Sequence, residues 1–230
     1  MIEVLRSSER AVSDHGDVAI WRSFAGDNRL DPRRGGFGPL LSIAETFIAP
    51  SAGFPMHPHR DMEIVSYMSM GAMAHRDSLG NVAVIGANEI QRMSAGTGVI
   101  HSEFNPSDQE ACCCLQIWIT PSAQGIAPSY EQTAFNVRPG VTLIAAPRGM
   151  GGAVTIHADI ALYAVRLEAG VSDTHMLAPG RRAYLQIARG GISVNGTDLA
   201  DGDGTAIEGE MNLDFKASSE GCEALLFELL

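Results

Sequence analysis

Residues 93–103 read Met-Ser-Ala-Gly-Thr-Gly-Val-Ile-His-Ser-Glu, a turn of small residues that runs into a short alternating stretch. The two glycines suit a tight turn, because glycine adopts backbone conformations that other residues avoid. His101 and Glu103 are two positions apart, so a β-strand would present both side chains on one face. We expect a strand over 99–103 that carries a histidine and a glutamate side by side.

The same two-residue alternation recurs along the chain, in short stretches bounded by Gly, Pro, Asn or Asp. Segments with a helical period are scarce, and residues 7–12 form the best short candidate. Many short strands joined by turns indicate an all-β sandwich or barrel. The predicted strands are 18–24, 41–49, 64–70, 99–103, 115–119, 142–145, 162–167, 184–189 and 224–229.

A turn-rich segment without apolar period, residues 121–140, predicts a linker between two halves of the chain. Each half contains a strand, a turn of small residues and a second strand that ends in a glycine turn. This weak internal similarity indicates two related β-barrels. We expect a first domain over 1–130 and a second over 131–230.

Charge and composition exclude several classes of protein. The 230 residues carry 27 acidic and 16 basic side chains, for a net charge of −11. This balance disfavours direct contact with nucleic acid or with an anionic membrane surface. Lys216 is the only lysine in the sequence, so Schiff-base chemistry is not expected.

The cysteines and the apolar runs indicate a location in the cytoplasm. No apolar run reaches the roughly 18 residues of a membrane-spanning helix, and the first residues do not resemble a secretory signal. Cys112, Cys113 and Cys114 are consecutive, and neighbours in a strand point to opposite faces. Such a run is poor material for disulfides, which favours a reducing compartment.

The histidines carry the clearest chemical signal. His57-Pro58-His59 would place two imidazoles on one strand face, as His101 and Glu103 lie on another. If these strands face each other inside a barrel, three imidazoles and one carboxylate meet. Such a set suits a transition metal and leaves two octahedral positions open, as in catalytic sites. Either pattern alone occurs commonly by chance and could simply be a polar turn, but the glycine turns before both favour the metal.

Three ordered blocks of sequence are more specific than any isolated pattern. They are residues 57–63 (His-Pro-His-Arg-Asp-Met-Glu), residues 75–81 (His-Arg-Asp-Ser-Leu-Gly-Asn) and residues 93–103. Together with Gln116-Ile117-Trp118-Ile119 and Tyr130-Glu131-Gln132 they resemble the pirin family, in its shorter bacterial form, over nearly the whole chain. Asp61-Met62 stands where many relatives have Gly-Phe, a change in the pocket wall that leaves the ligands intact.

The resemblance implies an all-β member of the cupin superfamily, a bicupin with two double-stranded β-helix (jelly-roll) barrels of which only the first binds metal. It implies that His57, His59, His101 and Glu103 are the metal ligands. The expected metal is Fe(II), although Zn, Ni, Mn, Cu or Co can occupy such a site. The resemblance also implies a monomer.

The implied activity is that of a quercetin 2,3-dioxygenase, which inserts both atoms of O2 into a flavonol and releases carbon monoxide. Glu103 would complete the metal shell and accept the proton of the flavonol 3-hydroxyl. The expected partners are a flavonol-like or enol substrate and O2, with no nucleic acid and no membrane. Since the imidazole ligands must be neutral, metal binding should weaken in acid.

Two other functions remain open at this point. The protein could be a metal-binding regulator or redox sensor that acts through protein partners without turnover, as is proposed for eukaryotic relatives. Alternatively, the metal could merely stabilise the fold, although two barrels with an ordinary apolar content do not need it.

Several further side chains carry separate expectations. Glu63 lies four residues after His59 and is either an acceptor for a ligating imidazole or a solvated turn carboxylate. His75 stands in a turn-like run and is expected to be part of a hairpin in which Arg76 and Asp77 pair.

The remaining histidines and the cysteine run carry expectations of their own. His157 and His175 are isolated and should lie in packing or in a pocket wall, and His15 should lie on the surface. At least one thiol of the 112–114 run should face the core as a small apolar group. The alternative is a redox-sensitive thiol near the barrel mouth.

Overall fold

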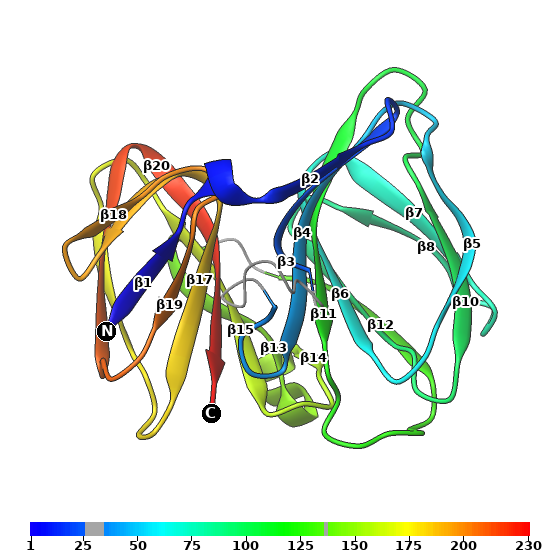
Figure 1. The fold of residues 1–230 in the computed structure, drawn as a ribbon. Coiled ribbons are helices and arrows are strands. Elements are labelled where there is room, and N and C mark those ends of the chain that lie inside the picture. Colours follow the sequence, from blue (N-terminus) through cyan, green and yellow to red (C-terminus); the bar gives the residue numbers. More distant parts are fainter. Residues whose placement is uncertain (26–34, 136–137) are drawn as a thin grey trace.

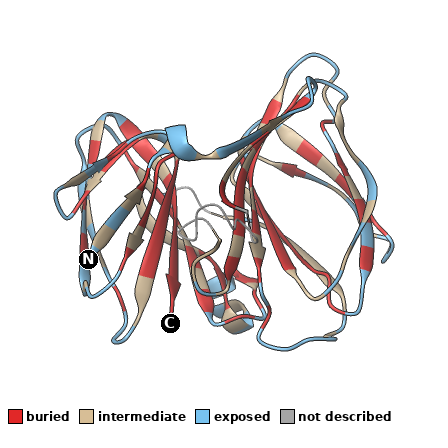
Figure 2. Ribbon diagram, in the orientation of Figure 1, coloured by how far each residue is buried: buried red, intermediate tan, exposed pale blue. Residues whose placement is uncertain are grey.

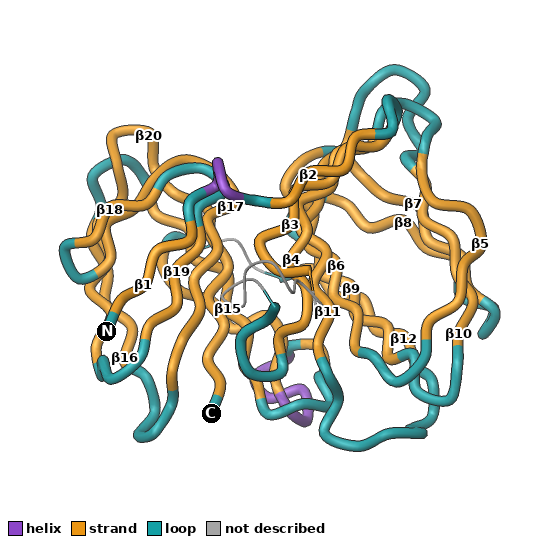
Figure 3. The backbone as a smooth tube through the Cα atoms, viewed as in Figure 1, coloured by secondary structure: helices purple, strands orange, loops and turns teal. Residues whose placement is uncertain are grey.

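The computed structural model describes residues 1–25, 35–135 and 138–230. Its regular structure is almost entirely β-strand, arranged as two barrels that lie side by side (Figure 1). Within the described residues, helical structure is confined to two 3-10 segments, η1 (Ser7–Glu9) and η3 (Pro147–Gly152) (Figure 3). Within the same residues no helix is long and apolar enough to cross a membrane.

The first barrel is built from two antiparallel sheets. The larger has seven strands in the order β12-β9-β6-β11-β4-β3-β2, and the smaller has four in the order β5-β10-β7-β8. Their bounds are β2 Ala11–Asp14, β3 Val18–Ala25, β4 Leu40–Ile48, β5 Gly53–His59, β6 Glu63–Met70, β7 Ala72–Asp77, β8 Val82–Gly86, β9 Glu89–Ser94, β10 Val99–Phe104, β11 Cys112–Ile119 and β12 Ser129–Ala134.

The second barrel is one nine-stranded sheet. Its main path runs β1-β19-β17-β20-β15-β13-β14, with β16 paired to β20 and β18 paired to β17. The bounds are β1 Ile2–Leu5, β13 Gly140–Ala146, β14 Val154–Thr155, β15 Ile160–Leu167, β16 Ser172–Met176, β17 Arg182–Val194, β18 Thr197–Leu199, β19 Gly204–Ile207 and β20 Asn212–Leu229.

The largest apolar cluster lies between the two barrels. It joins residues of the seven-stranded sheet, such as Ile117, to residues of β15 and β20, such as Leu162 and Phe227. Buried positions accordingly concentrate on the strands that face each other at the centre of Figure 2. A second cluster, which includes Leu185 and Phe215, fills the second barrel with apolar side chains. The two barrels therefore share one apolar cluster, and the second barrel has another of its own.

A polar network crosses the same interface at one end. Tyr67 of β6 donates its hydroxyl hydrogen to Glu223 of β20. Arg166 of β15 binds Glu223 and the Tyr67 hydroxyl, at 2.9 Å each, and Asn88 Oδ1 at 2.6 Å. Burial and then the adjacent Glu223 carboxylate raise the pKa of Tyr67. The network holds the hydroxyl protonated and ties the first barrel to the second.

The predicted strands all form, whereas the predicted helix does not. Only Ser7–Glu9 is helical, as a 3-10 turn, and β2 begins at Ala11, which pairs with Arg22 of β3. A helix of six residues has too few internal hydrogen bonds to persist in isolation, so pairing with the sheet prevails.

The predicted linker over 121–140 is interrupted by a strand. Residues 129–134 form β12, which pairs with β9 at the edge of the first barrel. Their polar side chains, half-buried at a sheet edge, concealed the strand in the sequence pattern. Residues 136 and 137 of the predicted linker lie outside the described residues.

The first barrel does not coincide with the predicted first domain, residues 1–130, at either end. β1 pairs with β19, so the first residues join the sheet of the second barrel rather than the first. The boundary at 130/131 falls inside β12. The division of the chain near residue 130 stays a prediction.

Candidate metal centre

The two histidine patterns lie on neighbouring strands of the four-stranded sheet. His57 on β5 is the register partner of His101 on β10, and His59 is the partner of Val99. A register shift follows, so that Glu103 lies opposite Phe54. The prediction placed the two strands face to face across the barrel. Instead they are adjacent, and cross-strand pairing brings the side chains together.

Two of the glycines in the turns before these strands permit close backbone approach. A Cβ on Gly53 would overlap the carbonyl oxygen of Glu103, so the start of β5 can approach β10 only without a side chain. Gly96 has a φ of 45°, and a Cβ there would overlap the carbonyl oxygen of Ile126. The glycine turns are therefore required by close backbone approach as well as by their conformation.

Three imidazoles form a compact group. The ring centres of His57 and His101 are 4.4 Å apart, those of His57 and His59 4.9 Å, and those of His59 and His101 5.0 Å. One nitrogen of each ring lies within 4.8 Å of the others. Since the rings come from three positions on two strands, the strand pairing alone sets this spacing.

Glu103 joins the group through His101 and brings in His75. One carboxylate oxygen of Glu103 and one nitrogen each of His75 and His101 also lie within 4.8 Å of one another. His75 is the register partner of Glu103 on β7. The predicted residues thus meet around His101, which belongs to both groups.

Burial keeps His59 and His101 neutral. Burial, followed by the nearby His57, lowers the pKa of His59 to about 4. Burial, followed by the proximity of His57, His59 and His75, lowers the pKa of His101 to about 3. At neutral pH these rings carry free lone pairs, which is the form that binds a metal.

The pKa of the Glu103 carboxyl changes in the opposite direction to that of His59 and His101. Burial raises its pKa to about 7, although the hydrogen bond from Gln116 partly offsets this effect. Gln116 Nε2 donates to Glu103 Oε2 at 2.7 Å. A carboxyl whose pKa lies near neutrality can either take or release a proton under ordinary conditions.

Unpartnered buried atoms test whether a cation fits these residues. His101 is fully buried, yet neither ring nitrogen has a hydrogen-bond partner, and Glu103 Oε1 has none either. Unpaired buried polar groups are costly. His57 Nδ1 lies 2.8 Å from the Pro55 carbonyl, which can only accept, so Nδ1 carries the proton and Nε2 keeps its lone pair. The donor set therefore fits a divalent transition metal.

A cavity of about 780 Å³ lies between the histidine cluster and the seven-stranded sheet. His57, His59 and Glu103 line one side, and Trp118 lies with its ring centre 5.4 Å from that of His59. The lining mixes small, aromatic and aliphatic side chains with few charges. This size and composition suit a small aromatic ligand.

Glu63 serves neither of its two predicted roles. It is fully buried, and its Oε2 accepts from the backbone N–H of His157 at 3.1 Å and lies 3.3 Å from His157 Nδ1. Asp61, with a φ of 48°, bends the chain between β5 and β6. Because of this bend, the even spacing from His59 does not place Glu63 on the same face, and Glu63 instead joins the two barrels.

His75 is the site residue that the sequence interpretation missed. It is buried beside His101, with ring centres 5.3 Å apart, and its Nε2 lies 3.1 Å from Asp77 Oδ2. The predicted pairing of Arg76 with Asp77 is wrong, because Arg76 is exposed on the opposite strand face and Asp77 accepts hydrogen bonds from Leu79 and Asn81. The two-residue spacing between His75 and Asp77 was the signal in the sequence that could have identified His75 as a site residue.

The other predicted side chains lie outside the cluster. His15 is exposed and His175 pairs with Glu228 in the second barrel, as expected for surface and packing positions. Cys112 and Cys114 are buried, which confirms that thiols of the run face the core. Burial raises the pKa of all three thiols of the run, which disfavours the redox-sensitive alternative.

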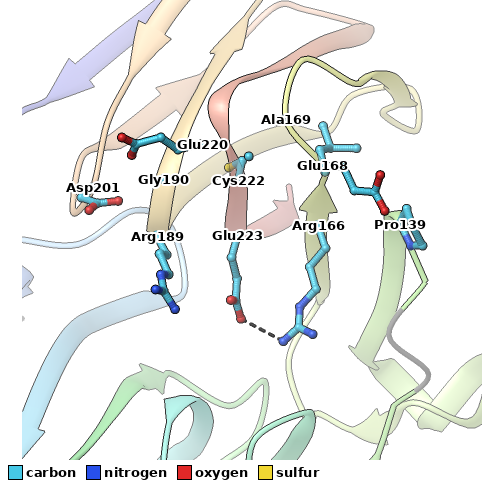
Figure 4. A pocket seen from close by; sticks show the side chains of 12 residues that line it. Pro139, Arg166, Glu168, Ala169, Arg189, Gly190, Asp201, Glu220, Cys222 and Glu223 are labelled. Carbon is cyan, nitrogen blue, oxygen red and sulfur yellow. Dashed lines mark hydrogen bonds and ion pairs between the residues drawn. The ribbon is translucent and has the colours of Figure 1, made fainter.

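A second cavity, of about 930 Å³, is lined by residues of the second half of the chain. Figure 4 shows Arg189, Glu223 and Arg166 on neighbouring strands with side chains pointing the same way, and Glu223 paired to Arg166. Acidic residues, including Glu168 and Glu220, outnumber the two arginines in the lining. The wall offers no imidazole and mixes both charges, so it has no ligand set comparable to that of the first barrel.

Models of two protein families match the chain. The model described as Pirin matches residues 6–119, and the model described as quercetinase C-terminal cupin domain matches residues 143–229. The chain is also 39% identical over 229 residues to the quercetin 2,3-dioxygenase of Escherichia coli (strain K12), covering 100% of this chain and 99% of that protein.

Solved structures agree with these matches. The crystal structure of YhhW from Escherichia coli has a TM-score of 0.95 and 38% identity, covering 100% of this chain and 98% of that one. The structure of the bacterial pirin YhhW in complex with nickel(II) has a TM-score of 0.93 and 39% identity, covering 100% and 99%. The predicted all-β bicupin is confirmed.

Proposed function

The chain belongs to the pirin family, and on this basis we propose that it is a metal-dependent dioxygenase that cleaves flavonol-like substrates with O2 and releases carbon monoxide. We propose that His57, His59, His101 and Glu103 hold one divalent transition metal, with Fe(II) as the working ion. The nickel(II) complex of a relative supports a divalent metal without selecting iron.

One observation carries the proposal. His101 is completely buried, and both of its ring nitrogens lack a hydrogen-bond partner. A protein rarely tolerates such a group unless a ligand or ordered water completes it. His101 also lies at the centre of four other ligand-type side chains, so a cation is the species that satisfies the most unpaired atoms at once.

Some of these residues would hold the metal, and others would orient the substrate. When bound, the metal supplies a Lewis acid and a redox centre for reaction with O2. The three imidazoles hold it as neutral ligands, with the His57 ring oriented by the Pro55 carbonyl. Trp118, beside His59, offers a flat wall for an aromatic ring.

Glu103 is the proposed proton acceptor. Burial raises its pKa to about 7 in the absence of a metal, and as a carboxylate it would take the proton of the flavonol 3-hydroxyl as the substrate binds. Gln116 keeps one carboxylate oxygen hydrogen-bonded, which leaves Oε1 for the metal or for the substrate proton. Deprotonation makes the substrate electron-rich, the form in which O2 can attack it.

The test is aerobic turnover of quercetin by Fe(II)-loaded protein, with metal content and released carbon monoxide both measured. His101→Ala and Glu103→Ala should each lower metal content and abolish carbon monoxide release. His15→Ala removes an exposed histidine far from the cluster and serves as the matched control. It should retain both.

The two readouts separate the competing functions. Stoichiometric metal without carbon monoxide release would favour a different substrate or a regulatory role through protein partners. A folded wild-type protein that binds no divalent metal would overturn the proposal.

A further inference from the structure

Among the described residues that line the cavity over the metal centre, Arg22 is the one permanently charged cation. It lies on β3 of the seven-stranded sheet, whereas β5 and β10 belong to the four-stranded sheet. We propose that Arg22 selects substrates that carry an anionic group, such as a carboxylate, at the end opposite the oxygens that approach the metal. This inference rests on the proposed function, since it names a feature of that site's substrate.

Strand register places Arg22 on the same face as the site residues. Arg22 pairs with Ala44 of β4, and Ala44 pairs with Gln116 of β11. Directly paired residues of antiparallel strands share a face, and all three line the cavity. Gln116 in turn holds Glu103. One row of side chains therefore runs from the metal centre to Arg22.

The middle of this row leaves space for a planar molecule. Ala44 between the two longer side chains has only a methyl group, and adjacent strands are about 4.8 Å apart, so the Cα atoms of Arg22 and Gln116 are about 10 Å apart. Ile20 and Trp118 line the cavity beside the row. A bicyclic or tricyclic aromatic would span this distance with one end at each polar group.

The guanidinium has capacity for such a ligand. Arg22 Nη1 donates to Ser13 Oγ at 2.8 Å, and no acidic side chain of the described residues pairs with Arg22. A guanidinium has five N–H donors in a planar fork that fits a carboxylate. Since Ser13 uses one donor and fixes the side chain, the others remain for an anion.

The experiment compares two probes, 3-hydroxyflavone and 3-hydroxyflavone carrying a 4′-carboxylate. Dissociation constants for metal-loaded protein are measured without O2 by quenching of tryptophan fluorescence. Wild type should bind the carboxylate roughly tenfold more tightly, as expected for one charge-assisted contact. Arg22→Gln should abolish this preference while the affinity for 3-hydroxyflavone stays within about twofold.

Arg189→Gln is the matched control, because it removes the same charge from an exposed position in the second barrel. It should keep the preference. Added salt should reduce the preference in the wild type. Equal binding of both probes by wild type, or a preference that survives in Arg22→Gln, would overturn the proposal.

Turnover of the same probes separates this proposal from the proposed function. If neither flavone releases carbon monoxide but the preference depends on Arg22, the selectivity stands and the dioxygenase assignment fails. If both are turned over and Arg22→Gln leaves their relative affinities unchanged, the dioxygenase stands and the assignment of Arg22 fails.

Discussion

Gln116 Nε2 donates a hydrogen bond of 2.7 Å to Glu103 Oε2 across the interior of the first barrel. The two residues lie in different sheets, Gln116 on β11 and Glu103 on β10. The amide holds one oxygen of a carboxylate whose other oxygen has no partner. The position of the proposed fourth ligand is thus set by the sheet opposite to the one that carries the histidines.

Replacement of Gln116 should weaken metal binding without removing a ligand. Gln116→Leu deletes the donor but keeps the volume, so Glu103 loses its orientation. Loss of a hydrogen bond to a ligating group typically lowers metal affinity about 10- to 100-fold. Chelator competition would measure this change, with Gln132→Leu on β12 as control. Unchanged affinity in Gln116→Leu would show that the bond does not orient the ligand.

The strands of the core were predictable because their chemistry is local. In β11 and β15, alternate side chains face the apolar cluster between the barrels, and this alternation is visible in the sequence. β12 has the sequence Ser-Tyr-Glu-Gln-Thr-Ala and lies at a sheet edge, so no apolar alternation marked it. The pairing of β1 with β19 joins residues about 200 positions apart, which no local pattern encodes.

The site was predictable where the proposed ligands share a strand and not where the chain bends. His101 and Glu103 keep the two-residue spacing on one strand, so their shared face followed from the sequence. The role of Glu63 did not, because the positive φ of Asp61 interrupts the alternation. His75 was assigned to a hairpin, which the pairing of β7 with β8 confirms, but the turn-forming residues that follow it concealed its proximity to His101.

Tyr67→Phe should destabilise the protein without affecting the metal centre. The variant removes the hydroxyl that binds Glu223 and Arg166 and leaves both charges less well satisfied at the interface. We expect a loss of about 2 kcal/mol in the free energy of unfolding. Urea denaturation measures it. Tyr163→Phe is the matched control, because that hydroxyl makes one long contact of 3.5 Å with Glu228, and it should cost less.

Gly53→Ala should disrupt the strand pairing that assembles the histidines. Its Cβ would overlap the Glu103 carbonyl oxygen and contact the Phe104 backbone, so β5 must move away from β10. We expect destabilisation of about 2 kcal/mol or more, together with weaker metal binding. Gly86→Ala provides the control, since the nearest atom to its Cβ is a flexible glutamate oxygen at 3.7 Å. Equal metal affinity in both variants would contradict the role of Gly53.

The Glu228 carboxylate should make stability depend on pH in the acid range. Hydrogen bonding from His175, together with a bond from the Ala178 N–H, lowers the pKa of Glu228 despite its burial. A carboxyl with a depressed folded-state pKa stabilises the fold above its unfolded pKa, 4.5 for this group, and this contribution disappears as pH falls through the folded pKa. Glu228→Gln should therefore cost about 1 kcal/mol at pH 5.5.

The difference between wild type and Glu228→Gln should be smaller at pH 3 than at pH 5.5, because the Glu228 carboxyl is protonated to a greater extent at pH 3 and a protonated carboxyl, like glutamine, carries no charge. Urea midpoints at the two pH values test this, with Glu220→Gln, an exposed residue of β20, as the control for a general change of charge. A constant difference at both pH values would mean that Glu228→Gln acts through packing. A larger difference at pH 3 would contradict the direction of the pKa change, because a depressed pKa can only add stability on the alkaline side.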